Sequence, residues 1–428
     1  MFDTVKKIHL PPALHHRDYA LLWAGVLISN AGSQMQLWSI FWHLRLLSDQ
    51  PIVVSGIGIA RFVPILVFAL IGGLVADTFN RKTVVLVTQT AMLAVATALG
   101  ALTASGQINL WWIYALVILQ GISIAFDGPS RQSLIPNLVP REDLPSAFGL
   151  QSIAANVGAV AGPALSGWVI ASIGIQWSYW INAISFLGVI AAVLMMGPIQ
   201  GDMESRQGGI IEGRVVPRLD LSEIPVGIRF ILHQPIILSS MILDFFATFF
   251  SSANTLLPFV AQDVLHVGSV GYGWLAAGQS IGSLVVAFIM SQRKQILGQG
   301  RLLLAAVAGF GVATILFGLS RTYLLTMAAL ILVGGSDTIS TVLRNTIRQL
   351  QTPDALRGRM VSINQIFFMG GPQLGEVEAG IVAQAFGTPA AIITGGIGCI
   401  LSVAVITARF PQLRNYNGDE AVAAGSQV

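Results

Sequence analysis

The stretch Gly72-Gly73-Leu74-Val75-Ala76-Asp77-Thr78-Phe79-Asn80-Arg81-Lys82 decides how this chain folds. It joins two long apolar runs, residues 53–76 and 83–104. About 20 apolar residues in a helix span the hydrocarbon core of a bilayer, so each run is long enough to cross it. Two glycines, one carboxylate and a basic pair between such runs predict a membrane hairpin with a charged turn.

The composition extends this prediction to the whole chain. Of its 428 residues, 54% are hydrophobic and only 10% are charged, whereas soluble domains carry about 25% charged residues. Most of the surface must therefore face lipid. Further apolar segments follow along the chain. With the first two, the predicted spans are 19–47, 53–76, 83–104, 109–133, 147–173, 177–197, 234–262, 270–290, 302–319, 322–348, 360–386 and 388–409.

These segments predict an all-α membrane protein with twelve transmembrane helices in two pseudo-symmetric six-helix bundles. We expect an N-terminal bundle at 1–197, a polar cytoplasmic linker at 198–230, a C-terminal bundle at 231–410 and a disordered cytoplasmic tail at 411–428. The single cysteine, Cys399, excludes an internal disulfide and is expected to be a small packing residue.

Lysine and arginine predict the orientation. The pairs Lys6–Lys7, Arg81–Lys82 and Arg293–Lys294 lie on one set of connections, and the opposite set holds Arg321 and Arg45. Cytoplasmic loops carry the excess of basic residues. We therefore expect a multi-pass protein of the plasma (inner) membrane with both termini and the long linker in the cytoplasm.

An internal repeat supports the division into six plus six segments. A shift of 213 positions aligns glycine, arginine and proline residues without a gap: Gly121, Arg131, Pro140, Gly158, Gly162, Gly167 and Gly174 fall on Gly334, Arg344, Pro353, Gly371, Gly375, Gly380 and Gly387. Repeated halves place a transporter's binding site at their interface.

Together these features resemble the major facilitator superfamily. The turn at Gly73, Asp77, Arg81 and Lys82 is similar to the superfamily's signature between helices 2 and 3, although Val75, Thr78 and Asn80 depart from it. In the fifth segment, the pattern of Gly158, Gly162, Pro163 and Gly167 resembles the glycine-proline signature of proton-coupled exporters. The run from Pro353 to Met360 is similar to the branch of enterobactin exporters and macrolide efflux permeases.

The resemblance implies two roles for these signatures. Gly73, Asp77, Arg81 and Lys82 would form a cytoplasmic latch, with Asp77 facing the start of the eleventh helix and Arg81 reaching Glu142 or Asp143. The alternative is that the turn only determines membrane topology: the basic pair stays in the cytoplasm and Asp77 is solvated. The small residues of the fifth segment would pack helices closely at the domain interface.

Ionisable residues inside spans are costly and are therefore candidates for function. Asp244 and Asp337 lie well inside their segments, as do Glu376 and Glu378, and these four acids are the proton-coupling candidates. A permanently paired structural charge is the alternative for the two aspartates. Asp127 and Arg131 have the i,i+4 spacing of an intrahelical pair. Arg344 and Arg348 lie near the predicted cytoplasmic face, where long side chains snorkel.

Depth along the helices predicts an outer gate. Arg61 lies 16 residues before Asp77, and Glu376 lies 18 residues beyond Gly358, so both lie about 24–27 Å above the latch. We expect Arg61 to pair with Glu376 or Glu378. Aromatic and amide side chains suit amphipathic organic ligands. The predicted substrate cavity is lined by Asn30, Gln34, Trp38, Phe245, Phe249 and Asn254.

The sequence therefore predicts a secondary active efflux transporter for amphipathic small molecules of the drug or siderophore type, driven by proton antiport through alternating access. An uptake or lysolipid-translocating permease and a non-transporting sensor are the alternatives. No nucleophile–His–carboxylate set, HExxH or GxxxxGK[ST] motif occurs, so we expect no enzyme activity. We expect no cofactor or metal, no nucleic-acid partner, and a monomer in the lipid bilayer.

Overall fold

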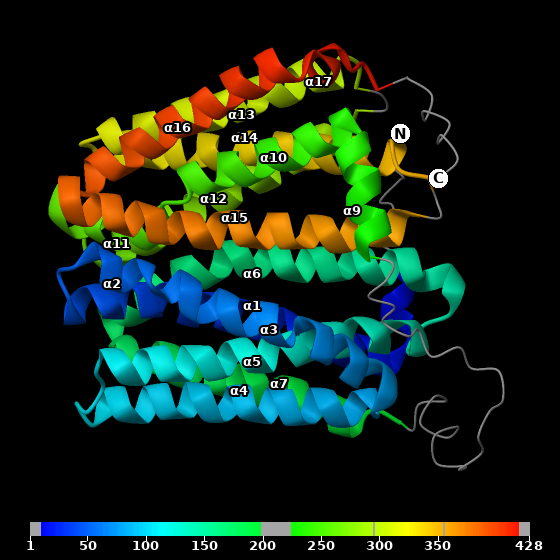
Figure 1. The fold of residues 1–428 in the computed structure, drawn as a ribbon. Coiled ribbons are helices and arrows are strands. Elements are labelled where there is room, and N and C mark those ends of the chain that lie inside the picture. Colours follow the sequence, from blue (N-terminus) through cyan, green and yellow to red (C-terminus); the bar gives the residue numbers. More distant parts are fainter. Residues whose placement is uncertain (1–9, 198–223, 294–295, 354–355, 419–428) are drawn as a thin grey trace, which may run out of the picture. The chain divides into compact units, whose positions relative to one another are not determined.

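The structure, a computed structural model, describes residues 10–197, 224–293, 296–353 and 356–418 (Figure 1). The surroundings of a few residues inside helices, including Asp77, Gly358 and Arg359, also lie outside the description. In the described part every regular element is helical, and no strand occurs.

The helices follow the predicted spans closely. The first half contains α1 (Arg17–Leu47), α2 (Pro51–Ser55), α3 (Ile57–Thr78), α4 (Arg81–Ala104), α5 (Leu110–Leu134), α6 (Leu144–Ser172) and α7 (Ile175–Met195). The second half contains α9 (Ile224–His233), α10 (Pro235–Ser251), α11 (Leu257–Phe259), α12 (Ser269–Ser291), α13 (Gln299–Leu319), α14 (Tyr323–Leu350), α15 (Arg357–Phe386), α16 (Thr388–Arg409) and α17 (Pro411–Asn415). Predicted and observed span ends agree within three residues when α2 is joined to α3, and α10 to the short turns after it. Among the described residues, a helical segment therefore occurs at each of the twelve predicted positions.

By length and hydropathy, ten of the described helical segments can cross a membrane. The segments α1 and α15 are not among these ten. Both carry polar residues along their length, which in α15 include Glu376 and Glu378. Polar residues in a spanning segment belong on surfaces that face protein or water.

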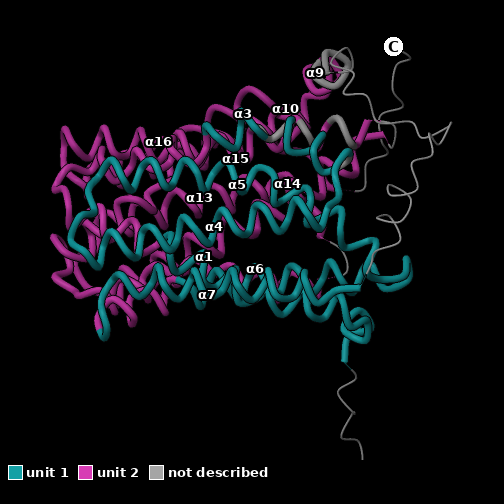
Figure 2. Tube along the Cα trace, turned by 90° about the horizontal axis from the view of Figure 1, so that it is seen from below, with its two compact units in different colours: residues 1–37, 63–162, 172–216 teal, residues 38–62, 163–171, 217–428 magenta. Residues whose placement is uncertain are grey.

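The described chain divides into two compact units, coloured separately in Figure 2. The first comprises residues 1–37, 63–162 and 172–216. The second comprises residues 38–62, 163–171 and 217–428. Most of the second half thus clusters with three pieces of the first half: the end of α1, the segment from α2 to the start of α3, and the last third of α6. The predicted bundle boundary at residues 198–230 remains a prediction.

Local sequence determines where helices begin and bend. Asn80 precedes α4, and its side-chain oxygen accepts a hydrogen bond from the Thr83 amide (3.2 Å), as expected of an N-cap. Asn109 caps α5 in the same way. The seventh predicted span is interrupted after Ser251 by a 3-10 turn at Asn254–Leu256 and a π turn at Val260–Val264.

Part of the predicted disordered tail is helical, and the end of the predicted linker already belongs to α9 (Ile224–His233). Residues 411–415 form α17, and both Leu413 and Tyr416 are buried, so this part of the tail is ordered against the second unit. The Tyr416 carbonyl accepts a hydrogen bond from the Gly300 amide (2.9 Å). Residues 419–428 and most of the linker, 198–223, lie outside the described residues. Cys399 is buried in an apolar cluster of the second unit, as its expected packing role requires.

Candidate functional site

An ion-pair cluster lies between α10 and α14 in the second unit. Asp244 on α10 is 1% exposed and contacts two arginines of α14, Arg344 (2.8 Å) and Arg348 (3.2 Å). Both arginines are themselves 2% exposed. They therefore do not snorkel to the membrane surface, which corrects that expectation. Burying a carboxylate without a partner is very unfavourable, so two guanidinium groups explain how Asp244 is accommodated.

Arg348 is held by several further hydrogen bonds. It donates from Nε to the Ser240 hydroxyl (3.1 Å), from Nη2 to the Ser240 carbonyl (3.0 Å) and from Nη1 to the Asn364 side chain on α15. Each donor of a buried guanidinium needs an acceptor, and these acceptors come from α10 and α15. Arg348 thus joins three helices and is a structural anchor of the cluster.

Asp337 differs from Asp244 in its surroundings. It lies midway along α14, and its Oδ1 is 3.7 Å from Arg344 Nη2, yet 43% of its side chain is exposed. The same Arg344 nitrogen also donates to the Thr341 hydroxyl (2.8 Å). Arg344 is therefore shared by a fully enclosed carboxylate and an accessible one. Asp337 is thus the more accessible and more loosely paired carboxylate of the cluster, and its role in proton coupling remains a prediction.

Spacing explains why these side chains meet. Asp337, Thr341, Arg344 and Arg348 follow one another at intervals of four, three and four residues, which places them on one face of a helix. Sequence analysis identified the acids but missed the role of Arg344 as a shared partner. The helical spacing from Asp337 to Arg348 was the signal that could have revealed it.

Arg61 and Glu376 lie close to each other within the second unit. Gly58, one turn before Arg61, packs so closely on α15 that a Cβ there would lie 3.0 Å from Glu376 Oε2. Glu376 is buried and Glu378 is half-buried. Of the two predicted partners, Glu376 thus faces the turn of α3 that contains Gly58 and Arg61, and both the ion pair and its gating role remain predictions.

The same end of the second unit holds contacts that sequence analysis missed. Arg45 at the end of α1 donates to Asp263 (2.8 Å) and to Asp49, and its guanidinium lies 4.8 Å from the centre of the Phe259 ring. Asp263 lies in the π turn, which reaches Arg45 across 218 residues of sequence. The sequence offered no periodic signal for this pair, because Asp263 falls in an irregular segment.

Hydroxyl and backbone contacts accompany Arg45 at this end. Ser55 and Thr255 share a hydrogen bond (2.9 Å), and Tyr272 donates to the Trp38 carbonyl (2.9 Å). Ser269 donates to the Gly167 carbonyl (3.0 Å). By the distribution of Lys and Arg, this is the predicted outer end of the membrane. In the second unit, the predicted outer ends of first-half helices are therefore packed on second-half helices.

The predicted latch is described only in part. The Asp77 side chain lies outside the description. A Cβ on Gly73 would meet nothing within 4 Å, whereas one on Gly72 would overlap the Ala125 carbonyl of α5. Close packing of α3 on α5 therefore depends on Gly72 and not on Gly73. Lys82 donates to the carbonyls of Met196 (3.0 Å) and Gly197 (3.2 Å) at the end of α7.

Of the two acidic neighbours proposed for Arg81, Asp143 has a different partner. Asp143 pairs with His16 (2.7 Å), and this contact joins the residue before α1 to the turn before α6. Asp127 and Arg131 form the expected intrahelical pair (2.9 Å). Asp127 is buried, and it also accepts hydrogen bonds from Thr88 (3.1 Å) and Gln89 (2.9 Å) of α4. This pair is thus part of the packing between α4 and α5.

The small residues of α6 pack as their signature predicts. A Cβ on Gly158 would lie 2.9 Å from the Asn30 backbone, and one on Gly162 would lie 2.8 Å from the Met35 amide. Gly167 contacts α12, where the Pro163 carbonyl lies against Gly273. Both sets of contacts fall within single units.

The predicted cavity residues are placed differently from one another. Asn30, Gln34 and Asn254 are half-buried. Trp38 is buried between the rings of Phe41 (5.5 Å) and Tyr272 (6.0 Å), so its ring packs in the second unit and does not line an open cavity. Phe245 and Phe249 stack on α10 at 5.9 Å, and Phe367 of α15 meets Phe245 edge-on at 6.1 Å. The half-buried rings of Phe245, Phe249 and Phe367 form an aromatic surface between α10 and α15. Among the described residues, no group of three or more metal-binding side chains occurs.

Comparison with known proteins agrees with the fold. Residues 10–424 match the family described as transmembrane secretion effectors. The enterobactin exporter EntS of Citrobacter koseri is 25% identical over 87% of this chain and 85% of its own. EntS of Escherichia coli O1:K1 is 24% identical over 84% of this chain and 82% of its own.

Solved transporters share the same fold. A bacterial homologue of the human lysosomal transporter Spinster, in an inward-facing and occupied conformation, superposes with a TM-score of 0.68 at 14% identity, covering 94% of this chain and 98% of its own. A bacterial homologue of the iron transporter ferroportin in an inward-facing state superposes with a TM-score of 0.66 at 16% identity, covering 93% and 98%. From the match over almost its whole length, together with this helical fold, the chain belongs to the transmembrane secretion effectors of the major facilitator superfamily.

Proposed function

We propose that this multi-pass membrane transporter is a secondary active exporter that releases amphipathic small molecules from the cell in exchange for protons. The observation that carries the proton part is the accessible Asp337 carboxylate, halfway along a span and 3.7 Å from Arg344. Arg344 in turn holds the enclosed Asp244. Carboxylates at such depth belong to ion or proton pathways more often than to the fold alone.

The charges of the cluster suggest how a proton can act. With Asp337 ionised, two carboxylates face two arginines and the cluster is neutral. A proton on Asp337 leaves a net charge of +1, and an uncompensated charge is costly wherever water is excluded. Two conformations that hydrate Asp337 differently will therefore differ in proton affinity. That difference allows proton binding to drive a conformational change.

The direction and the class of substrate rest on other observations. Relatives at about 25% identity are named as exporters of enterobactin, and the family is described as secretion effectors. The aromatic surface of Phe245, Phe249 and Phe367 favours a ligand with ring systems or other apolar parts. The packed contacts at the predicted outer end, including Arg45–Asp263 and Ser55–Thr255, support alternating access, since an exporter must break them to release its ligand.

We further propose that the chain acts as a monomer in the plasma membrane with both termini in the cytoplasm, without enzyme activity and without a cofactor. The proton gradient is then the energy source. The excess of Lys and Arg in one set of connections supports this orientation.

Transport in everted membrane vesicles tests the proposal. Vesicles are acidified inside, a pH-sensitive dye reports proton movement, and a panel of amphipathic compounds including siderophores is added. Export by antiport predicts that a transported compound enters the vesicle and releases protons from it. Compound movement without proton release would contradict antiport. Movement in the opposite direction would indicate an importer, and binding without movement would indicate a sensor.

Two variants sharpen the vesicle experiment. Asp337→Asn should abolish substrate-dependent proton release. Asn345→Ala is the control on the same helix, because Asn345 is exposed and lies outside the ion-pair cluster, so its loss should leave release unchanged.

A further inference from the structure

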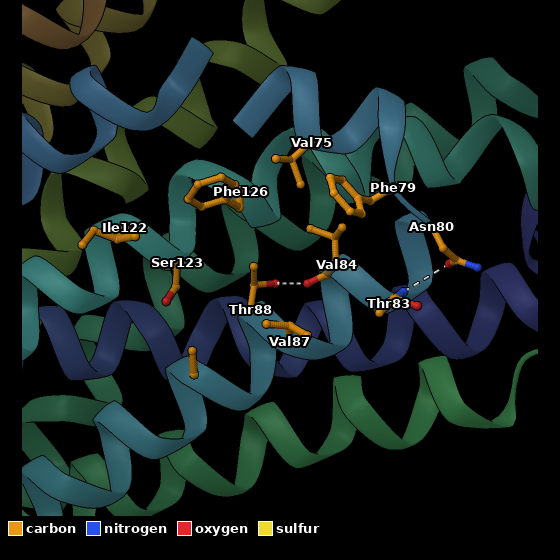
Figure 3. Close-up of a pocket in the computed structure, with 11 residues that line it drawn as sticks. Val75, Phe79, Asn80, Thr83, Val84, Val87, Thr88, Ile122, Ser123 and Phe126 are labelled. Carbon is orange, nitrogen blue, oxygen red and sulfur yellow. Dashed lines mark hydrogen bonds between the residues drawn. The ribbon is translucent and has the colours of Figure 1, made fainter. Parts of the chain in front are cut away.

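A pocket of about 560 Å³ lies in the first unit between the end of α3 and the facing sides of α4 and α5 (Figure 3). Its walls are mainly apolar and are formed by Val75, Phe79, Val84, Val87, Ile122 and Phe126. Two of the three hydroxyls that border it have internal partners: the Thr88 hydroxyl lies 3.0 Å from the Val84 carbonyl, and Ser123 donates to the Leu119 carbonyl. The pocket therefore has a mainly apolar lining, and few of its polar groups need a hydrogen bond from a ligand.

The mouth and the length of the pocket match a lipid chain. Phe79 and Val87 at its edge are 65% and 63% exposed, and apolar side chains exposed on a membrane-spanning unit contact lipid. Its lining along α4 runs from Asn80 to Ala91. Eleven residues of helix measure about 16 Å. That length is about half of a 30 Å hydrocarbon core, or one leaflet.

The polar end of the pocket is positively polarised. Asn80 and Thr83 line this end at the N-terminus of the 24-residue helix α4, and a helix N-terminus carries partial positive charge. Arg81 follows Asn80 at this end, whereas the Lys82 ammonium is held by the carbonyls at the end of α7. The three charges of this turn, Asp77, Arg81 and Lys82, sum to +1. A phosphate is the group that a helix N-terminus beside an arginine accommodates best.

We infer that this pocket binds an anionic phospholipid of the predicted cytoplasmic leaflet, with one acyl chain between α3, α4 and α5 and the phosphate at the start of α4. The occupied pocket lies beside the close contact between Gly72 of α3 and Ala125 of α5. A bound chain would fill the gap next to that contact and hold the charged turn in place. This inference does not depend on which compound is transported or on proton coupling.

The test is lipid binding to the purified full-length chain, measured by native mass spectrometry. The delipidated protein is titrated with phosphatidylglycerol or phosphatidylcholine of the same chain length. Ala91→Phe fills the deep end of the pocket and should weaken binding of the first phosphatidylglycerol at least tenfold. Ala94→Phe is the matched control, because Ala94 is exposed one turn further along α4 and does not line the pocket. Val87→Trp, at the exposed mouth, is a second blocking variant that does not disturb buried packing.

The headgroup is tested separately. Arg81→Gln should reduce the preference for phosphatidylglycerol over phosphatidylcholine about fivefold, since a basic residue near a membrane surface contributes roughly that factor. Arg141→Gln, an exposed arginine on the same predicted side, should not. Equal binding by the wild type, Ala91→Phe and Val87→Trp would mean annular lipid only and would overturn the inference. Displacement of the lipid by a transported compound at equal occupancy would also overturn it, because the pocket would then be a substrate site.

Discussion

Asp244 and Asp337 contact the same arginine, but the consequences of losing each carboxylate differ. Asp244 is enclosed and faces both Arg344 and Arg348, whereas Asp337 is 43% exposed and faces Arg344 alone. Removing one partner of a buried pair leaves uncompensated charge, while an accessible and loosely paired group is hydrated in its absence. Stability and transport are therefore expected to depend on different members of the cluster.

The first prediction separates these two roles. Asp244→Asn should lower the free energy of unfolding by about 3–5 kcal/mol, because two buried arginines lose their counterion. Asp337→Asn should change it by less than about 1 kcal/mol. Thermal or denaturant unfolding of the purified variants in detergent measures both. Equal destabilisation by the two substitutions would show that the cluster is a single structural unit.

A second prediction concerns Arg61 and Glu376. If their attraction closes the predicted outer end, Arg61→Glu should impair transport, and Glu376→Arg should impair it as well. The double variant should recover a substantial part of the activity, because opposite charges face each other again. Glu378→Arg combined with Arg61→Glu is the control and should not recover, since Glu376 is the acid beside Arg61. Recovery with Glu378 in place of Glu376 would refute the pairing.

At the residue scale, the sequence predicted which side chains are costly in a membrane but not how they pair. Asp127 and Arg131 were predictable, since their partners are four residues apart in one helix. Asp244 and Arg344 are 100 residues apart, and Asp263 and Arg45 are 218 apart. Such pairs depend on how helices pack, which periodicity within one helix does not encode. The side chain of Asp77, the centre of the charged turn, lies outside the description, so its latch role remains a prediction.

Single glycines determine how closely particular elements pack. In α6, Gly162 packs on α1 so closely that a Cβ would lie 2.8 Å from the Met35 amide and 2.9 Å from the Ala31 carbonyl. Backbone atoms cannot move aside as a flexible side chain can. Gly149, in the same helix, has nothing within 4 Å of its Cβ position. Substitution by a larger residue should therefore be harmful at Gly162 and tolerated at Gly149, although both glycines occur in the same helix.

The third prediction uses this contrast. Gly162→Val should force α6 away from α1 and lower the yield of folded protein and the unfolding midpoint, at a cost of about 1–3 kcal/mol or more for overpacking. Gly149→Ala should be neutral or slightly stabilising, since alanine favours a helix by up to about 1 kcal/mol over glycine. Unfolding midpoints of the two variants test this. A stable Gly162→Val protein would contradict the close packing.

At the element scale, long apolar runs predicted the helix bounds well because hydrocarbon thickness sets their length. The irregular seventh span was not predicted in detail. Its hydropathy is continuous, but Pro258 lacks an amide donor and Asn254 begins a 3-10 turn, so the helix is interrupted. The resulting π turn presents Asp263 to Arg45. Hydropathy is averaged over a window of residues, so it does not reveal short 3-10 or π turns such as those in this span.

For the whole molecule, the proposal requires that the packed contacts at the predicted outer end open and close during transport. Ser55 and Thr255 are suited to test this, because their hydroxyls are 2.9 Å apart and they come from opposite halves of the sequence. Both belong to the second compact unit. The only native cysteine, Cys399, is buried and can be replaced by serine to give a clean background.

The fourth prediction is that Ser55→Cys with Thr255→Cys, in the Cys399→Ser background, forms a disulfide under mild oxidation. Cross-linking should stop transport, and a reducing agent should restore it. Each single-cysteine variant should transport equally well under both conditions. Full activity of the cross-linked protein would contradict alternating access through this end.

The most direct measurement of the central claim compares two modes of transport by Asp337→Asn in proteoliposomes. In the first mode, labelled compound exchanges with unlabelled compound at equal pH on both sides. In the second, a pH gradient drives accumulation of the compound. The proposal predicts that the variant keeps exchange within about twofold of the wild type but loses gradient-driven accumulation. Gradient-driven accumulation by Asp337→Asn at the wild-type level would contradict Asp337 as the residue that couples proton movement to export.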